Sequence, residues 1–139
     1  MTDPPIMEPW ALSAREHIRD TLTRYTWSGD AGRADDLALA FCEDGVLEVR
    51  GRPPIEGRAA IAAFIGGVAT DNEGQRSTVA ADDIPRLVRH NIANVRFTTL
   101  TQSTAQVESY FTVLTGIGLD HLGRYRDTFA PVGDQWLIR

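Results

Sequence analysis

Apolar residues recur at helical spacing through the first half of the chain, whereas the second half alternates in the manner of strands. The first apolar stripe consists of Ala14, Ile18, Leu22 and Tyr25. It predicts a helix over about residues 10–28, and Ser13 with Glu16 forms a capping-box pattern that is expected to start it. Further helices are predicted over about residues 34–42 and 58–70.

The clearest strand pattern lies in residues 106–115. One of its faces carries Val107, Ser109, Phe111 and Val113, and the other carries Glu108, Tyr110, Thr112 and Leu114. Further strands are predicted over about residues 46–50, 86–100, 123–131 and 135–139. Residues 71–84 are polar and lack periodicity, so we expect a loop there that gates access to a site.

Helices early in the chain and long antiparallel strands late in it are typical of the α+β class, in which helices pack on one side of a sheet. The length of 139 residues suits one domain. We therefore expect a loose arm over residues 1–9 and a single domain over residues 10–139. Within that domain, Cys42 is expected in the core. Trp136 is a candidate for an apolar wall of a pocket, or more simply a core residue. Two charged residues are expected on a solvated strand face, Arg124 and Asp127.

Composition excludes several classes of function. The formal net charge of −5 provides no basic surface for nucleic acid or anionic lipid. All 14 basic residues are arginines, which excludes Schiff-base chemistry on a lysine. With one cysteine and three histidines, neither an internal disulfide nor a structural zinc site is expected. Because the GxGxxG, GxxxxGK[ST] and HExxH motifs are missing from the sequence, we expect neither a cofactor nor a metal ion.

The sequence also lacks targeting signals. No apolar run approaches the roughly 20 residues that span a membrane. Residues 1–5 are acidic and rich in proline, unlike a signal peptide. The expected location is therefore the cytoplasm, without membrane contact.

Three local patterns occur in order along the chain. The first is Tyr25-x-Trp27-x-x-Asp30, followed by Asp35-Asp36-Leu37 and Phe41-x-x-Asp44-Gly45. The second is Gly57-x-x-x-Ile61-x-x-Phe64. The third is Arg89-His90-x-x-x-Asn94, followed by Gly123-Arg124-Tyr125-x-Asp127-x-Phe129 and Gly133-Asp134-x-Trp136. Together they resemble the SnoaL-like branch of the nuclear transport factor two-like superfamily, over about residues 10–139.

This resemblance implies a cone-shaped barrel. In such a fold a curved mixed, mostly antiparallel sheet packs against three N-terminal helices, with an apolar pocket between them. The resemblance also implies a homodimer formed through the open face of the sheet. A small, largely apolar or cyclic organic ligand is the expected partner of the pocket. The fold alone does not define a reaction, because the same superfold hosts many activities.

Asp30 and His90 are the residues to which the resemblance assigns catalysis. In scytalone dehydratase and in hexachlorocyclohexane dehydrochlorinase, a carboxylate after the first helix orients a histidine that removes a proton from substrate carbon. Asp30 and His90 match these two residues in this chain. A neutral imidazole is a suitable general base near neutral pH, and a carboxylate on its other nitrogen fixes the tautomer. The alternative is structural, with Asp30 in an Asx turn and His90 as a hydrogen-bonded strand residue.

Tyr25 is the third candidate. In the related ketosteroid isomerases a tyrosine at the matching position donates a hydrogen bond to an enolate oxygen, although a core tyrosine would give the same pattern. Val49 occupies the place of the isomerase's carboxylate base, and this weakens the isomerase interpretation. The remaining residues expected to contact substrate are Trp27, Leu47, Phe64, Tyr110 and Tyr125, of which the last two could instead lie on the dimer face.

These observations favour a cofactor-independent lyase of the dehydratase type, or an isomerase. Two alternatives stay open. One is a non-catalytic ligand-binding or assembly subunit, similar to the β subunits of ring-hydroxylating dioxygenases, and the other is a polyketide cyclase. An enzyme predicts a cavity of several hundred cubic ångströms with Asp30 and His90 at its wall.

Overall fold

The fold is that of a computed structural model that describes residues 6–76 and 87–139. Its elements follow one another as α1 (Pro9–Asp30), α2 (Ala34–Ala38), β1 (Val46–Leu47), β2 (Ile55–Glu56), α3 (Arg58–Arg76), β3 (Val88–Leu100), β4 (Ala105–Thr115), β5 (Gly118–Val132) and β6 (Gln135–Ile138). Three helices therefore precede the long strands, as the sequence predicts. Among the described residues, no helix is long and apolar enough to cross a membrane.

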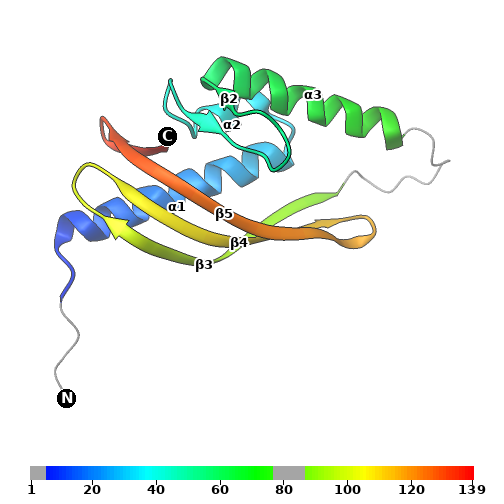
Figure 1. The fold of residues 1–139 in the computed structure, drawn as a ribbon. Coiled ribbons are helices and arrows are strands. Elements are labelled where there is room, and N and C mark those ends of the chain that lie inside the picture. Colours follow the sequence, from blue (N-terminus) through cyan, green and yellow to red (C-terminus); the bar gives the residue numbers. More distant parts are fainter. Residues whose placement is uncertain (1–5, 77–86) are drawn as a thin grey trace.

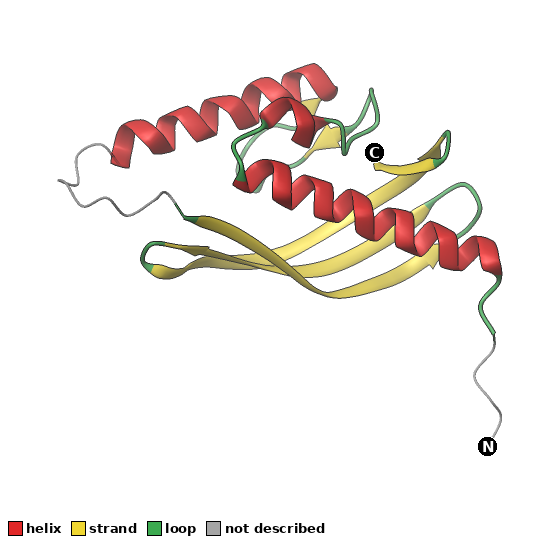
Figure 2. Cartoon of the chain, turned by 180° about the vertical axis from the view of Figure 1, so that it is seen from behind, coloured by secondary structure: helices red, strands yellow, loops and turns green. Residues whose placement is uncertain are grey.

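The helices cover one face of a curved sheet (Figure 1). Strands β3, β4, β5 and β6 pair in this order, all antiparallel, and β1 pairs with β2 in a separate small hairpin. A parallel bridge between Phe41 and Ile138 joins the segment after α2 to the edge strand β6. In Figure 2, α1 runs along the sheet, whereas α2 and α3 lie farther from it. The predicted α+β fold of helices on a curved, mostly antiparallel sheet is confirmed.

Helix α1 begins earlier than the capping pattern predicts. Its N-cap residue is Glu8, and Pro9 occupies the first turn. Proline is favoured there because its fixed φ suits the helix and its missing N–H has no intrahelical partner to lose. Ser13 lies inside the helix instead of capping it, so the predicted capping box with Glu16 is wrong.

Three predicted boundaries differ in the structure, at the loop over residues 71–84 and at two strands. Helix α3 continues to Arg76, so the loop predicted over residues 71–84 is wrong for 71–76, and the rest of it lies outside the described residues. A helix propagates through a polar segment because each added residue contributes a backbone hydrogen bond.

Strand β5 begins at Gly118, five residues before its predicted start at 123, because Gly116 and Ile117 form a two-residue hairpin turn. β1 is only two residues long and ends at Leu47.

The two faces of the sheet differ as the alternation predicts. Val107, Ser109 and Val113 are buried on the face toward the helices, which we call the inward face. The opposite, outward face carries four of the exposed large apolar side chains, namely Tyr110, Leu114, Leu119 and Leu122. The homodimer expected through this outward face stays a prediction.

The core lies between α1, α2 and the inward face. Ile18, Phe41 and Phe129 are almost fully buried and come from α1, the segment after α2, and β5. Trp136 belongs to the same cluster, and Cys42 is buried in a separate small cluster with Ala130 and Leu137, so both occupy core positions. Burial of such apolar surface is the main favourable term in folding. The core therefore fixes α1 on the sheet, and with it the position of the residues at the end of α1.

Candidate active site on the inward face of the sheet

Asp30 and His90 are in direct contact. The imidazole Nδ1 of His90 lies 2.6 Å from Oδ1 of Asp30. The backbone N–H of His90 also donates to this carboxylate, with distances of 3.2 Å to Oδ1 and 3.0 Å to Oδ2. The His90 side chain is 24% exposed and that of Asp30 13%, so the pair is sheltered but open to solvent. The chain thus brings together two residues that are 60 positions apart.

The contact forms where the end of α1 meets the beginning of β3, which lie close together in Figure 2. Asp30 is the last residue of α1, and Gly32 turns the chain away with a φ of 72°. A carboxylate is unfavourable at a helix C-terminus, where the unpaired carbonyl groups carry partial negative charge. The N–H and the imidazole of His90 offset this cost by donating to it. An Asp in this place is therefore explained by its partner and not by helix stability.

The geometry fixes the chemistry that the imidazole can perform. Because Nδ1 faces a carboxylate, the proton of the neutral ring resides on Nδ1, and Nε2 keeps its lone pair. Nε2 can then accept a proton, and Asp30 stabilises the imidazolium that results. The arrangement is that of an oriented general base.

Aromatic side chains continue the site along the inward face. Tyr25 of α1 and Tyr125 of β5 meet edge to face with ring centroids 5.9 Å apart, and a hydrogen bond links their side chains. Phe111 stacks on Tyr125 at 4.4 Å. Burial, followed by the charge of Asp127, raises the pKa of Tyr25 to about 12, so its hydroxyl stays a hydrogen-bond donor at neutral pH. Burial also raises the pKa of Tyr125, and Asp30 contributes to this shift.

Asp127 does not lie on a solvated strand face, and that prediction is wrong. It follows Tyr125 by two residues on β5, so both project from the inward face, and Asp127 is partly buried there. Burial raises its pKa from 3.8 to about 7. The charge of Asp127 is felt by both tyrosines, which places it beside the tyrosine pair. Arg124 is on the opposite face and is exposed, as predicted.

Two of the predicted contact residues point elsewhere. Trp27 is 72% exposed and does not lie on the inward side as expected for a pocket wall. Tyr110 is 54% exposed on the outward face, which is the second of the two positions left open for it. Trp27 points away from the core because Tyr25, Thr26 and Ser28, its neighbours along α1, occupy the side of the helix that packs in the protein. Tyr110 is on the outward face since its neighbour Ser109 is on the inward one.

Leu47 and Phe64 are partly buried, but only one of them joins the main core. Leu47 packs against the cluster that contains Phe41. The ring of Phe64 lies under the guanidinium of Arg52, 5.4 Å from its centroid. Neither residue has a described contact with Asp30 or His90, so their role toward a ligand stays a prediction.

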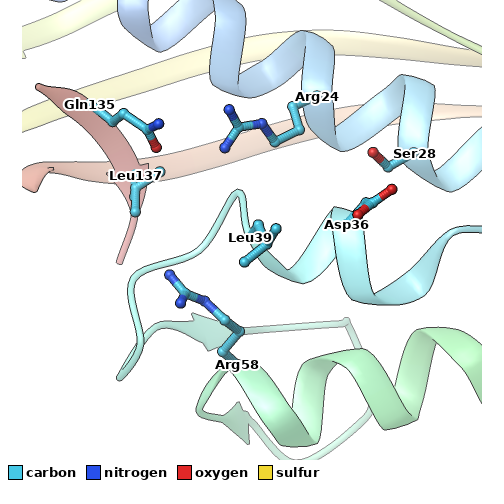
Figure 3. Close-up of a pocket in the computed structure, with 7 residues that line it drawn as sticks. All are labelled: Arg24, Ser28, Asp36, Leu39, Arg58, Gln135 and Leu137. Atoms are coloured by element: carbon cyan, nitrogen blue, oxygen red, sulfur yellow. The ribbon is translucent and has the colours of Figure 1, made fainter.

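Two cavities along the described residues lie away from the Asp30–His90 pair. The larger measures about 610 Å³ and is drawn in Figure 3. It is lined by Arg24, Ser28, Asp36, Leu39, Arg58, Gln135 and Leu137. Arg58 in this cavity already donates two hydrogen bonds to the carbonyl oxygen of Phe41. The other, of about 410 Å³, lies near Trp10 and Trp136. Neither contains a predicted catalytic residue, so the enclosed pocket expected around the pair is not among them.

The described side chains show no metal centre. No group of three or more His, Cys, Asp or Glu residues gathers as metal ligands within residues 6–76 and 87–139. The second Asp–His contact, between Asp120 and His121, measures 2.7 Å and is largely exposed. Both residues lie on β5.

The comparisons with known proteins identify a family. A family model described as the SnoaL-like domain matches residues 10–139. The chain belongs to the SnoaL-like domain family. Its predicted membership of the nuclear transport factor two-like superfamily is confirmed, because solved structures of that superfamily share its fold. No curated protein matches the sequence.

Several solved structures resemble this SnoaL-like chain. An NTF2-like protein with a cystatin-like fold from Novosphingobium aromaticivorans is 28% identical, with a TM-score of 0.71, and the match covers 91% of this chain and 78% of that one. A protein of the same organism with the provisional name scytalone dehydratase is 19% identical, with a TM-score of 0.70 and coverages of 91% and 80%. The protein Aln2 from a Streptomyces species is 17% identical, with a TM-score of 0.75 and coverages of 97% and 90%. The last two resemble the chain in fold alone.

Sequence reasoning missed two polar residues of the inward face, Ser109 and Asp127. Strand alternation placed Ser109 on the same face as Val107, but gave no reason to treat it as more than a small buried residue. For Asp127 the sequence contained a signal. It lies two residues from both Tyr125 and Phe129 on one strand, so the three side chains share a face, and Phe129 is fully buried. The alternation of side chains along β5 therefore outweighs the usual preference of a carboxylate for solvent.

Proposed function

We propose that this SnoaL-like protein is a cofactor-independent lyase or isomerase that removes a proton from carbon of a small cyclic organic molecule. The observation that carries the proposal is the 2.6 Å contact between Asp30 and Nδ1 of His90, which leaves Nε2 available as a base. The ligand lies on the inward face, where His90, Tyr25 and Tyr125 keep part of their surface exposed.

The step begins with transfer of a proton from a carbon next to a carbonyl group to Nε2 of His90. The electron pair of the broken C–H bond moves toward the carbonyl oxygen, and Tyr25 donates a hydrogen bond to the developing negative charge. In a dehydration the pair then forms a C=C bond while the bond to a β-hydroxyl group breaks, and that group takes the proton from Nε2 of His90 and leaves as water, which regenerates the base. In an isomerisation the proton returns from His90 to another carbon. Both outcomes conserve atoms and use no redox partner.

The family supports this proposal at the level of fold and not of reaction. A protein of similar fold carries the provisional name scytalone dehydratase, and its identity of 19% transfers no substrate to this chain. What favours catalysis over a purely structural pair is the exposure of His90, since a buried structural histidine would have both ring nitrogens engaged.

Turnover by variants of the pair tests the proposal. Wild-type protein is assayed on a panel of cyclic β-hydroxy ketones, followed as water loss, and of cyclic β,γ-unsaturated ketones, followed as conjugation. We expect turnover of at least one member, and its loss in His90→Ala. His17→Ala is the control, because it removes an imidazole from α1 that takes no part in the Asp30–His90 contact. Full turnover by His90→Ala would remove the mechanism. Binding of panel members without any turnover would favour the non-catalytic ligand-binding alternative.

A further inference from the structure

Ser109 and Asp127 are polar side chains on the inward face whose hydrogen-bonding capacity is not used by the described residues. Ser109 is only 2% exposed, and its Oγ has no hydrogen-bond partner there. Asp127 is partly buried, and no cation or donor of the described chain accounts for its placement, since burial is the cause of its raised pKa. Polar groups withdrawn from water without partners cost free energy, and such groups in native proteins have a reason to persist.

The sheet register brings the two side chains together. Ser109 pairs with Tyr125 across β4 and β5, and Asp127 pairs with Val107. Ser109 and Asp127 are therefore diagonal neighbours on one face, with Cβ atoms about 7 Å apart. One oxygen atom placed between their side chains can reach both, because each hydrogen bond spans about 2.7 Å.

We propose that Ser109 and Asp127 form a second subsite that binds a hydroxyl group of the ligand. The inference rests on the proposed function in so far as the ligand is the molecule that also reaches His90. The hydroxyl oxygen accepts a hydrogen bond from Ser109, and its O–H donates a hydrogen bond to the carboxylate of Asp127. A carbonyl group has no proton for Asp127, and an ammonium group could donate to both side chains but would leave the O–H of Ser109 without an acceptor. A hydroxyl group is neutral, and so it enters this partly buried wall at a lower desolvation cost than a cation.

The position of the subsite sets the length of the ligand. His90 pairs with Val113, which is four residues from Ser109 along β4. Four residues of strand span about 14 Å, and Phe111, whose ring stacks on Tyr125, lies in this interval. A ligand that reaches both ends is therefore at least two rings long, and it carries its hydroxyl group at the end far from the carbon that loses a proton.

Two probes that differ by one methyl group test this subsite. 4-Hydroxybiphenyl carries a hydroxyl donor at one end of two rings, and 4-methoxybiphenyl keeps the oxygen but not the proton. Binding of each is measured by fluorescence titration with the full chain. We expect wild-type protein to prefer 4-hydroxybiphenyl by about tenfold, the effect of a hydrogen bond to a charged group. Asp127→Asn and Ser109→Ala should each reduce this preference, whereas the exposed Asp20→Asn should not change it.

The pH dependence identifies Asp127 as the acceptor. The titratable groups that interact with it are the phenols of Tyr25 on α1 and Tyr125 on β5, while its β4 neighbours Val107 and Ser109 carry no charge. Binding of 4-hydroxybiphenyl should be tighter at pH 8 than at pH 6, because the carboxylate is a stronger hydrogen-bond acceptor than the carboxylic acid. A phenol of this kind titrates near pH 10, about two units above this range. Histidine side chains in general also change charge near neutral pH. The affinities at pH 6 and pH 8 are therefore compared again in Asp127→Asn, where the pH effect should disappear.

Several results would overturn the subsite. They are equal affinity for the two probes, tighter binding at the lower pH, no effect of either substitution, or no binding of either probe. The binding readout is independent of turnover. If the hydroxyl preference holds while no panel substrate reacts, the subsite stands and the proposed reaction falls. If substrates react with unchanged kcat and KM in both variants and the probes bind equally, the subsite falls and the Asp30–His90 mechanism stands.

Discussion

The carboxylate of Asp30 binds the backbone N–H and the imidazole Nδ1 of His90 at the same time. The two contacts act on different parts of one residue. The backbone contact holds the beginning of β3 against the end of α1, and the imidazole contact orients the ring. Asp30 therefore has a structural and a chemical role, and substitutions can separate them.

Asp30→Ala and Asp30→Asn separate these roles. Asp30→Ala leaves the His90 N–H without its acceptor and should lower the free energy of unfolding by about 1–3 kcal/mol in urea denaturation. Asp30→Asn keeps an acceptor oxygen for the N–H and should unfold within about 1 kcal/mol of wild type. Both should lose turnover, by about 100- to 10,000-fold in kcat, because an amide does not stabilise the imidazolium or the required tautomer. Equal loss of stability in both would contradict the dual role.

Asp127 should make stability depend on pH. Its pKa is about 7 in the fold against 3.8 as the ordinary value, so between these values the native state holds a proton that the unfolded chain has released. The stabilisation is fully present below about pH 4 and is lost as pH rises through about 7. Asp127→Asn has no charge to bury and should gain up to about 4 kcal/mol relative to wild type between pH 4 and pH 8. Thermal unfolding at several pH values measures this gain, and exposed Asp20→Asn is the control.

Tyr25→Phe should lower kcat with little effect on the fold. Its phenol is a donor at neutral pH, because the pKa is raised to about 12. Loss of a donor to a developing oxyanion costs about 100-fold in kcat, and loss of the link to Tyr125 costs about 1 kcal/mol of stability. Tyr110→Phe is the matched control on the outward face, where 54% of the residue is exposed. A Tyr25→Phe protein with full kcat would show that Tyr25 only packs in the core.

Gly123 gives Phe111 the room to stack on Tyr125. A Cβ at Gly123 would lie 2.7 Å from two ring atoms of Phe111, closer than packed atoms allow. Gly123→Ala should therefore displace the ring and cost about 1–3 kcal/mol of stability. Gly116→Ala is the control, since nothing lies within 4 Å of a Cβ there. Equal stability of both variants in urea denaturation would show that Phe111 moves aside freely.

Much of the fold was predictable because its signals are local. The stripe of Ile18 and Leu22 gave α1, and the alternation of residues 106–115 gave β4 with the correct inward face. The capping box at Ser13 was misleading, because a proline earlier in the chain offered a better start. The sequence-based prediction for Asp127 was wrong because the residues that bury it belong to α1 and β4, which are distant from β5 in the sequence.

The sequence by itself determined which residues alternate, where glycine and proline interrupt, and that Asp30 and His90 are chemically suited to each other. Only the tertiary structure decided that they touch, since their distance depends on the core between Ile18, Phe41 and Phe129 that fixes α1 on the sheet. It also decided that Trp27 and Tyr110 point away, and that Ser109 and Asp127 share one wall. The reason is physical: a side chain's charge state and partners follow from burial by segments distant in sequence, and burial is a property of the packed chain.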